Sequence, residues 1–205
     1  MVDKYQLMVD GITDNEAKVM DHLVRNFHER ISINEIARRL DISPQGSMKI
    51  LRKLHAMQLA LPEISKNGIF YKPDLREESS KKLFEFILLK KGMDNYAKVY
   101  AVDLKQLQPY ALGCVLFGSV LEKGKDARDI DVLLIIEKSQ FKELNKHLNE
   151  FKEMSAKKIH DIMVAPAELK EGILKKQPVF LDILKKGAIL WGAQYFVEAV
   201  KDGTR

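Results

Sequence analysis

Hydrophobic residues recur at helical spacing through residues 12–58. Positions three or four apart share one face of a helix, so this spacing predicts a series of amphipathic helices. Thr13 and Glu16 form the Ser/Thr-x-x-Glu pattern of a capping box, which marks the start of the first helix. Ser43 followed by Pro44 is typical of the start of a later helix. The apolar positions are Ala17, Met20, Leu23, Val24 and Phe27, then Ile33, Ile36, Ala37 and Leu40, then Met48, Leu51, Leu54 and Met57.

A hairpin and a longer helical stretch are expected next. Residues 64–71 read as two short strands around Lys66-Asn67-Gly68, because Asn-Gly favours a tight turn between antiparallel strands. Residues 73–108 have helical spacing and contain no segment rich in Pro, Ser and Gly. We therefore expect this stretch to form a long helical connector.

Three short apolar runs mark the second half of the chain, at residues 114–117, 129–136 and 159–164. Runs of this length that end at turn residues are typical of buried strands. Hydrophobic residues at helical spacing occur between the last two runs and again at residues 167–190. The order strand, turn, strand, helix, strand predicts a fold of the α/β or α+β class. The residues of the intervening helix pattern are Phe141, Leu144, Leu148 and Phe151.

Composition narrows the class of protein. Of 205 residues, 46% are hydrophobic and 31% are charged, and the net charge is +5, which is typical of a soluble globular protein and not of a disordered one. The apolar runs are far shorter than the ~18–20 residues of a membrane span. The first residues, MVDKYQLMVDG, lack the basic-then-apolar layout of a signal peptide. A single cysteine, Cys114, excludes an internal disulfide and a CxxC metal site. We expect a cytoplasmic protein with no membrane partner.

The first half resembles a winged helix-turn-helix domain, in which the second helix enters the major groove of DNA and the hairpin, or wing, contacts the backbone. The matching segments are SINEIARRL, DIS, PQGSMKILRKLHAMQL and EISKNGIFY. The charge is consistent with this resemblance. Between Arg38 and Lys72 seven Lys and Arg residues face two acidic ones, a net charge of +5 that equals that of the whole chain. Basic residues near a duplex release counterions, which gives affinity for any DNA sequence.

Contacts to double-stranded DNA are expected on the second helix and the wing. Winged helices also serve as protein-docking and dimerisation modules, so a protein partner or a homodimer stays open. The residues expected to contact DNA are Ser43, Gln45, Ser47, Lys49, Arg52, Lys53 and Lys66.

In the second half, two acidic residues stand at the start of an apolar run. Asp129 and Asp131 are two positions apart, which places their side chains on the same face of a strand. Two adjacent carboxylates repel each other unless a cation neutralises them, and hard oxygen ligands suit Mg²⁺ or Mn²⁺. The preceding run ends at Gly118-Ser119, where glycine permits close backbone approach. Asp161, in the third run, is expected to complete the cluster as a third acid.

The hydrophobic pattern also gives expectations for three other polar residues that could belong to this cluster. His160 is expected on the opposite face of the strand from Asp161, as a core or surface residue. Glu168 and Asp182 are the other candidates for the third acid, but both lie in stretches with helical spacing.

Residues 111–192 resemble the nucleotidyltransferase superfamily related to DNA polymerase β, in its minimal form. The match consists of Phe117-Gly118-Ser119, Gly124, Asp129-x-Asp131 and Asp161, together with the tail QPVFLDILKKGAILWG. The chain departs from the family at Arg128, where Ser is common, and at Gly124, which comes one residue later than expected.

The resemblance implies a fold, a reaction and a set of roles. The fold is a small mixed sheet with helices. The reaction is transfer of a nucleoside monophosphate from an NTP to a hydroxyl, with release of pyrophosphate. Asp129, Asp131 and Asp161 would be the catalytic residues that ligate Mg²⁺ or Mn²⁺, with Asp161 also a candidate general base. Gly118 and Ser119 would hold the phosphates of the nucleotide, with help from Lys123 or Lys125.

The whole chain is thus expected to be an α+β protein. A winged helix-turn-helix domain at 1–75 and a helical connector at 76–108 precede a small nucleotidyltransferase-like domain at 109–205. The preferred hypothesis is a Mg²⁺-dependent nucleotidyltransferase that also binds DNA. The alternative is a DNA-binding transcriptional regulator whose second domain senses a nucleotide or binds a cognate protein, as an antitoxin does.

Overall fold

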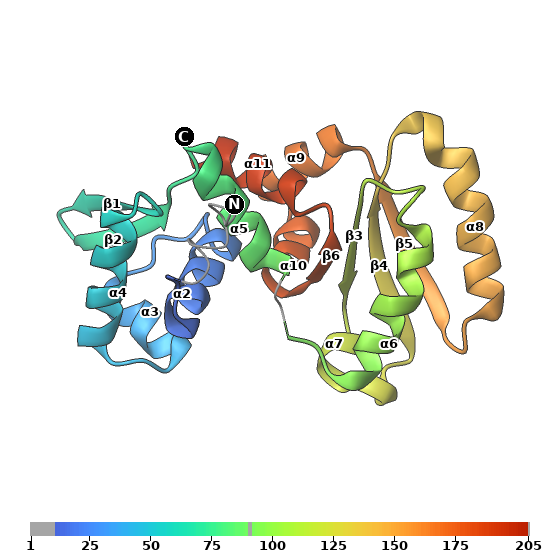
Figure 1. Cartoon of the computed structure of the whole chain (residues 1–205), viewed down its shortest axis with the longest axis horizontal. Coiled ribbons are helices and arrows are strands. Elements are labelled where there is room, and N and C mark those ends of the chain that lie inside the picture. Colours follow the sequence, from blue (N-terminus) through green and yellow to red (C-terminus); the bar gives the residue numbers. More distant parts are fainter. Residues whose placement is uncertain (1–10, 90–91, 205) are drawn as a thin grey trace, which may run out of the picture. The chain divides into compact units, whose positions relative to one another are not determined.

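The computed structural model describes residues 11–89 and 92–204. They form a mixed α and β structure, which confirms the predicted α+β class (Figure 1). The chain divides into two compact units, Met1–Ile87 with Val200–Arg205, and Leu88–Ala199, and each is described by itself. Within the described ranges no helix combines the length and the apolar character that a membrane span requires.

The first unit is built from short helices followed by a two-stranded hairpin. The predicted caps are present: Thr13 and Glu16 form a capping box, and Ser43 accepts a hydrogen bond from the backbone N–H of Gly46, with Pro44 at the first helical position. The hairpin strands pair antiparallel and end at the pair Ser65 and Gly68. The elements are α2 (Asp14–Arg25), α3 (Ile33–Leu40), α4 (Pro44–Ala56), β1 (Ala60–Ser65), β2 (Gly68–Pro73) and α5 (Glu78–Leu89), of which α5 crosses into the second unit.

The second unit contains a small mixed sheet, and the three predicted apolar runs supply three of its strands. Its strand order is β5-β4-β3-β6, with β4 and β5 parallel and the other pairs antiparallel. Figure 1 shows this sheet with α8 running beside it. The strands are β3 (Gly113–Phe117), β4 (Asp129–Ile135), β5 (Lys158–Val164) and β6 (Ala188–Trp191). The helices are α6 (Asn95–Asp103), η1 (Leu104–Leu107), α7 (Val120–Lys123), η2 (Gly124–Asp126), η3 (Lys138–Gln140), α8 (Phe141–Met154), α9 (Pro166–Leu174), α10 (Pro178–Lys186) and α11 (Ala193–Gly203), of which α11 crosses into the first unit.

Both faces of this sheet are covered, which makes its central strands apolar at nearly every position. Ile130, Val132 and Leu134 of β4 belong to one buried cluster with Leu144 and other residues of α6, η1 and α8. Alternation along β4 sends Leu133 and Ile135 to the opposite face, where they are also fully buried. Helices α9 and α10 lie against β5 and β3.

The stretch expected as a connector, 76–108, is divided between the units. Its second part is not a spacer, because Ala97, Tyr100, Leu104 and Leu107 are buried within the core that covers the sheet. Helix α6 begins at an Asp94 cap, whose carboxylate accepts a hydrogen bond from the backbone N–H of Ala97.

Candidate functional site

The first candidate site lies at the start of β4. Asp129 and Asp131 are both partly exposed, whereas Ile130 and Val132 between and after them are fully buried. The strand therefore presents the two carboxylates on one face, as their spacing predicted.

Gly118 makes room for one of these carboxylates. It follows the end of β3, where Phe117 pairs with Asp131, and its φ of 73° lies in the left-handed region that favours glycine. A Cβ atom at this position would overlap the carboxylate oxygen Oδ2 of Asp131. Any larger residue would thus force the Asp131 side chain away from its place.

The third polar side chain of this cluster comes from β5. In the parallel pairing of β4 and β5, His160 stands opposite Asp131. Its Nδ1 atom is 3.5 Å from Oδ2 of Asp129 and 3.6 Å from Oδ1 of Asp131. The ligand atoms of the three residues lie within 4.8 Å of one another, which is close enough to hold a metal ion. We call Asp129, Asp131 and His160 the carboxylate–histidine site.

Asp161 is not part of this site, which corrects the prediction that it supplies the third acid. It pairs in register with Val132, so its side chain leaves the opposite face of the sheet. There Nζ of Lys152 on α8 lies 2.5 Å from Oδ1 of Asp161. The expectation for His160 is corrected as well, since the alternation that removes Asp161 from the cluster brings His160 into it.

The two other candidates for the third acid, Glu168 and Asp182, have partners outside this site. Oε2 of Glu168 accepts a hydrogen bond of 2.7 Å from the backbone N–H of Ala165 at the start of α9. Asp182 forms an ion pair of 2.9 Å with Lys186 on α10. Neither belongs to the carboxylate–histidine site.

Electrostatic repulsion is built into the site. Burial and then the neighbouring Asp129 carboxylate raise the pKa of Asp131 above its ordinary value, and His160 opposes this shift. A side chain in such surroundings is more stable when a cation neutralises it. The site therefore favours bound positive charge.

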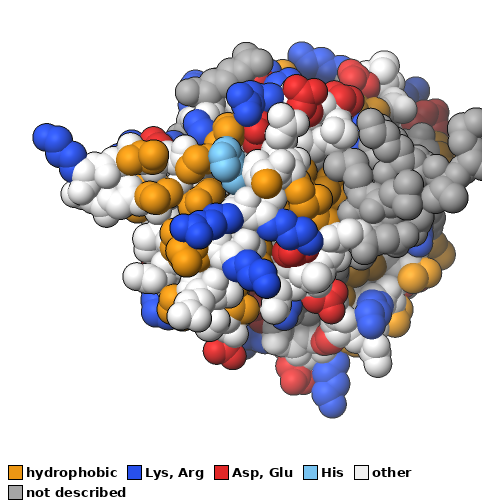
Figure 2. Space-filling view, turned by 60° about the vertical axis from the view of Figure 1, so that its left-hand side comes forward, with side chains coloured by type: hydrophobic (Ala, Val, Ile, Leu, Met, Phe, Trp, Pro, Cys, Tyr) orange, Lys and Arg blue, Asp and Glu red, His pale blue; other side chains and the backbone are white. Residues whose placement is uncertain are grey.

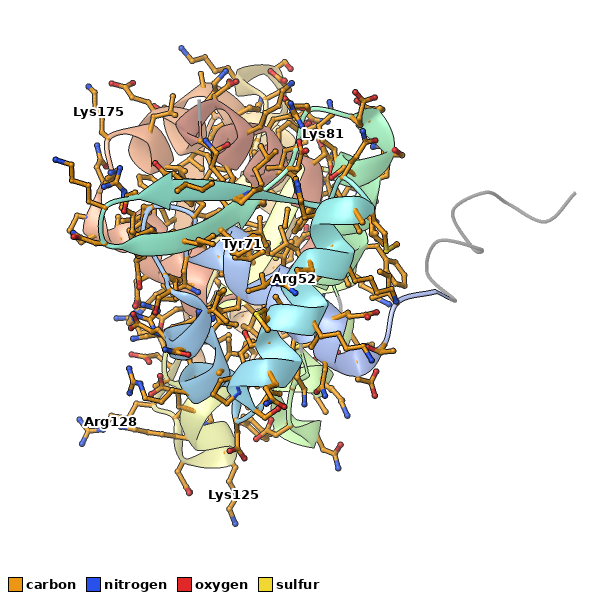
Figure 3. All side chains as sticks on the ribbon, turned by 90° about the vertical axis from the view of Figure 1, so that its left-hand side faces the viewer. Arg52, Tyr71, Lys81, Lys125, Arg128 and Lys175 are labelled. Carbon is orange, nitrogen blue, oxygen red and sulfur yellow. The ribbon has the colours of Figure 1, made fainter. Side chains whose placement is uncertain are left out.

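The residues expected to hold phosphates come from the segment between β3 and β4. Ser119 follows Gly118 and is partly exposed, and its side chain does not cap helix α7. Lys123 ends α7 and is exposed. Lys125 and Arg128 extend outward from the loop that leads into β4 (Figure 3).

Lys158 is a further cation that the sequence did not single out. It pairs in register with Asp129 and therefore lies on the same face of the sheet as His160. Its side chain is exposed, and no salt bridge to it is found among the described residues. The face that carries the carboxylates thus also carries a positive charge.

Lys157 fixes the loop that precedes Asp129. Its Nζ atom donates a hydrogen bond of 2.6 Å to the backbone oxygen of Lys125 and a second one to that of Ala127. The same ammonium group lies 5.0 Å from the ring centre of Tyr96 on α6. These contacts connect the start of β5 to the loop before β4. The nearer of the two contacts, at Ala127, lies two residues before Asp129.

The second candidate site is the surface of α4 and the hairpin. Figure 2 is turned so that this part comes forward, and it shows Lys and Arg side chains scattered among hydrophobic ones. Figure 3 looks onto the same elements and labels Arg52 on α4 and Tyr71 on β2. A groove of about 400 Å³ runs between the start of α4 and the hairpin turn. Its lining residues include Asn34, Gln45, Met48, Asn67 and Ile69.

Of the residues predicted to contact DNA, most are exposed, whereas Ser47 is buried and Lys53 is held by contacts within the domain. Gln45, Lys49, Arg52 and Lys66 are exposed, and the described part of the chain offers the three cations no ion-pair partner. Ser43 is exposed too, but its hydroxyl caps α4.

Ser47 and Lys53 do not fit the prediction as simply. Ser47 is fully buried and donates a hydrogen bond to the backbone oxygen of Ile33, so its side chain cannot meet DNA, which corrects that assignment. Lys53 is bound within the domain, with Nζ 2.9 Å from Glu16 and 3.0 Å from the backbone oxygen of Gly11. Burial would raise the pKa of Glu16, but hydrogen bonds from Thr13 and Lys53 outweigh it and leave that pKa lowered.

Comparison of the chain with protein-family models, with curated proteins and with solved structures gave no match.

Proposed function

We propose that the second unit is a metal-dependent nucleotidyltransferase that transfers a nucleoside monophosphate from an NTP to a hydroxyl. The main support is the pair Asp129 and Asp131, held side by side at the start of β4 with Gly118 packed against one of them. The hydrophobic-Gly-Ser motif at the end of β3 and the Asp-x-Asp motif at the start of β4 meet here on adjacent antiparallel strands. This is the arrangement that the resemblance to the polymerase β-related superfamily implies.

A divalent cation is part of this proposal, and the donor set fits one. Asp129, Asp131 and His160 would hold it, since their ligand atoms lie within 4.8 Å of one another. When bound, the cation would neutralise phosphate charge and favour the ionised form of the attacking hydroxyl.

The remaining roles fall to residues around the carboxylates. Ser119, whose side chain does not cap α7, would donate a hydrogen bond to a phosphate oxygen of the nucleotide. Lys123 and Lys158 would neutralise the leaving pyrophosphate, because both are exposed cations. Lys158 pairs in register with Asp129, and Lys123 ends α7, which contacts β4. In the transfer, the acceptor hydroxyl gives its proton to water and its oxygen bonds to the α-phosphorus, while the bond from the α-phosphorus to the oxygen that bridges to the β-phosphate breaks. Pyrophosphate leaves with that electron pair.

Asp161 has no role in this proposal. It lies on the face of β5 opposite the carboxylate–histidine site and is paired with Lys152, so it is not placed to act as the general base that the resemblance implied. The site therefore differs from a set of three carboxylates in both composition and charge.

The test is transfer of label from α-labelled NTPs into protein, DNA or RNA in the presence of a divalent metal. Wild type and the control Asp126→Asn, an exposed acid in the loop before β4, should label the same acceptor. The double variant Asp129→Asn/Asp131→Asn should lose labelling. Equal labelling by the double variant, or no labelled acceptor with any NTP and metal, would overturn the proposal.

We further propose that the first unit is a winged helix-turn-helix domain that binds double-stranded DNA. The support is the group of exposed cations that form no ion pair with any described residue, Lys49 and Arg52 on α4 and Lys66 in the hairpin turn. Cations available to phosphates release counterions on binding, so the affinity should fall steeply with salt. Fluorescence anisotropy with a labelled duplex over a range of salt concentrations tests this proposal, and a salt-insensitive or undetectable signal would remove it.

A further inference from the structure

The third donor of the carboxylate–histidine site is a ring nitrogen, not an oxygen. His160 supplies it from β5, with Nδ1 3.5 Å from an Asp129 oxygen and 3.6 Å from an Asp131 oxygen. The imidazole is 45% exposed, so its approach to the carboxylates is not forced by tight packing around the ring. The donor set is therefore two carboxylates and one imidazole on a single face of the sheet.

The fold prevents Asp161 from replacing His160. A one-residue slip of β5 against β4 would bring Asp161 onto the carboxylate face, because side chains alternate along a strand. The same slip would turn Ile159, which is 5% exposed and packed in the core with Val132, out of that core. Register is strongly specified where a face is buried, so the imidazole donor is a fixed property of the site.

Metal ions differ in how they accept this donor set. Mg²⁺ takes oxygen ligands in near-ideal octahedral geometry and retains water. Imidazole suits first-row transition metals, and for a given site containing nitrogen these ions bind in the order Mn²⁺ < Fe²⁺ < Co²⁺ < Ni²⁺ < Cu²⁺ > Zn²⁺. A nitrogen donor in place of a third carboxylate also removes one negative charge from the site. This change lowers the affinity for a hard cation such as Mg²⁺ most.

We propose that the carboxylate–histidine site is a transition-metal site that prefers ions such as Mn²⁺ and Co²⁺ over Mg²⁺. The use of the metal in nucleotide transfer rests on the proposed function, whereas binding of the metal does not. Of the two ions expected from the sequence, Mg²⁺ and Mn²⁺, this proposal favours Mn²⁺, with His160 as the residue that determines the preference.

The experiment measures metal binding by the full chain after removal of metals, with no nucleotide present. Free Mn²⁺ is followed by electron paramagnetic resonance, with Mg²⁺ as the competitor, and Co²⁺ is followed by its visible absorption. Wild type should bind Mn²⁺ at least about tenfold more tightly than Mg²⁺. His160→Ala should weaken Mn²⁺ binding about tenfold and change the Co²⁺ spectrum. His160→Asp should improve Mg²⁺ binding and bring the two affinities together.

The control is His147→Gln, which changes a histidine on α8 that stacks on Tyr110 and lies outside the site. It should bind Mn²⁺ and Mg²⁺ like wild type. Circular dichroism spectra of the His160 variants should match that of wild type, because the replaced ring is partly exposed. Equal affinity of wild type for Mn²⁺ and Mg²⁺, or an affinity ratio unchanged in both His160 variants, would overturn the inference.

The outcomes separate this inference from the proposed function. Mn²⁺ binding that depends on His160, in a protein that labels no acceptor, would support the metal site and overturn the transferase. Carboxylate-dependent labelling by a protein that binds Mn²⁺ and Mg²⁺ equally, with an affinity ratio unchanged in both His160 variants, would support the transferase and overturn the metal preference.

Discussion

His160 on β5 lies directly across the parallel strand pair from Asp131 on β4, with its Nδ1 atom 3.6 Å from the Asp131 carboxylate. The next residue, Asp161, faces α8 and is paired with Lys152. These two neighbouring residues thus lie on opposite faces of the sheet, because side chains alternate along a strand. The strand register therefore decides the chemistry of the site.

Asp131→Asn is expected to stabilise the metal-free protein. The wild-type carboxylate is partly buried next to Asp129, which raises its pKa, and the amide removes that unfavourable charge. Thermal unfolding in the presence of a chelator should show a higher Tm, by roughly 4 °C for each kcal/mol gained in a domain of this size. Asp126→Asn, in the exposed loop before β4, should give no comparable gain.

The gain from Asp131→Asn should depend on pH. Because folding raises the pKa of Asp131, the folded protein holds this proton where the unfolded chain has lost it. The free energy of unfolding of the wild type therefore falls as the pH rises through the folded-state pKa of Asp131. The difference in Tm between variant and wild type should be small near about pH 4 and larger near about pH 7. A constant difference over this range would contradict the assignment of the effect to this ionisation.

Lys157→Met is expected to weaken metal binding without unfolding the protein. The methionine keeps an apolar stem near Tyr96 but loses the hydrogen bonds to the backbone oxygens of Lys125 and Ala127, which hold the loop before Asp129. Loss of a group hydrogen-bonded directly to a metal ligand costs roughly 10–100-fold in affinity, and Lys157 acts one step further out, so we expect a loss of at most about tenfold. Titration with Mn²⁺ measures the effect, and Lys146→Met on α8 is the control. Lys157→Arg should restore part of the affinity, and an unchanged affinity in Lys157→Met would refute the positioning role.

Lys158→Ala is expected to weaken nucleotide binding and to leave metal binding without nucleotide nearly unchanged. Its exposed side chain shares a face with the carboxylates, where it can meet phosphate oxygens. A charged hydrogen bond is worth about 1.5 kcal/mol or more, so the Kd for a non-hydrolysable NTP should rise about tenfold. Calorimetry with this analogue and Mn²⁺ checks the result, with Lys142→Ala on α8 as the control. A normal Kd in Lys158→Ala would exclude this phosphate contact.

Arg52→Ala is expected to reduce DNA affinity and the salt dependence of that affinity. Loss of one phosphate contact lowers the slope of log affinity against log salt by about 0.9. Lys53→Ala should change this slope less, because Glu16 and Gly11 already hold the Lys53 ammonium. Anisotropy titrations at several salt concentrations compare the two variants.

Ser47→Ala provides a second comparison on the same helix. Its hydroxyl is buried against the Ile33 backbone oxygen, so the variant should lose stability but not DNA affinity per folded molecule. Equal losses of DNA affinity in Arg52→Ala, Lys53→Ala and Ser47→Ala would contradict the division of α4 into exposed and internal polar residues.

Local signals in the sequence predicted much of the fold. The capping residues Thr13 and Ser43, the hairpin and the strands around Gly118 and Asp129 are all present, because each depends on contacts within a few residues. The position of α6 was not predicted. Its residues Ala97 and Tyr100 are buried only because the sheet packs against them, which is a contact distant in sequence.

The third residue of the site was missed for a related reason. In β5, Ile159 and Met163 lie on one face and Ile162 and Val164 on the other, so apolar residues occupy both. A strand covered on both faces has no alternation from which to read the side that a polar residue takes. The register with β4 supplies that information. With it, His160 and Lys158 fall on the carboxylate face together.

The net charge of +5 between Arg38 and Lys72 overstates the number of cations available to DNA. Glu16, Glu29 and Glu35 precede this stretch in the sequence and are not included in that sum. In the fold these acids pair with basic residues of the counted stretch: Glu16 with Lys53, and Glu29 and Glu35 with Arg39. Pairing across elements therefore neutralises part of the apparent excess.

Anomalous X-ray scattering from crystals grown with Mn²⁺ and a non-hydrolysable NTP tests the site most directly. The predicted result is a manganese peak bounded by carboxylate oxygens of Asp129 and Asp131 and a ring nitrogen of His160, with the nucleotide phosphates beside it. A manganese peak that involves Asp161 in place of His160, or the absence of any peak at β4, would contradict this account.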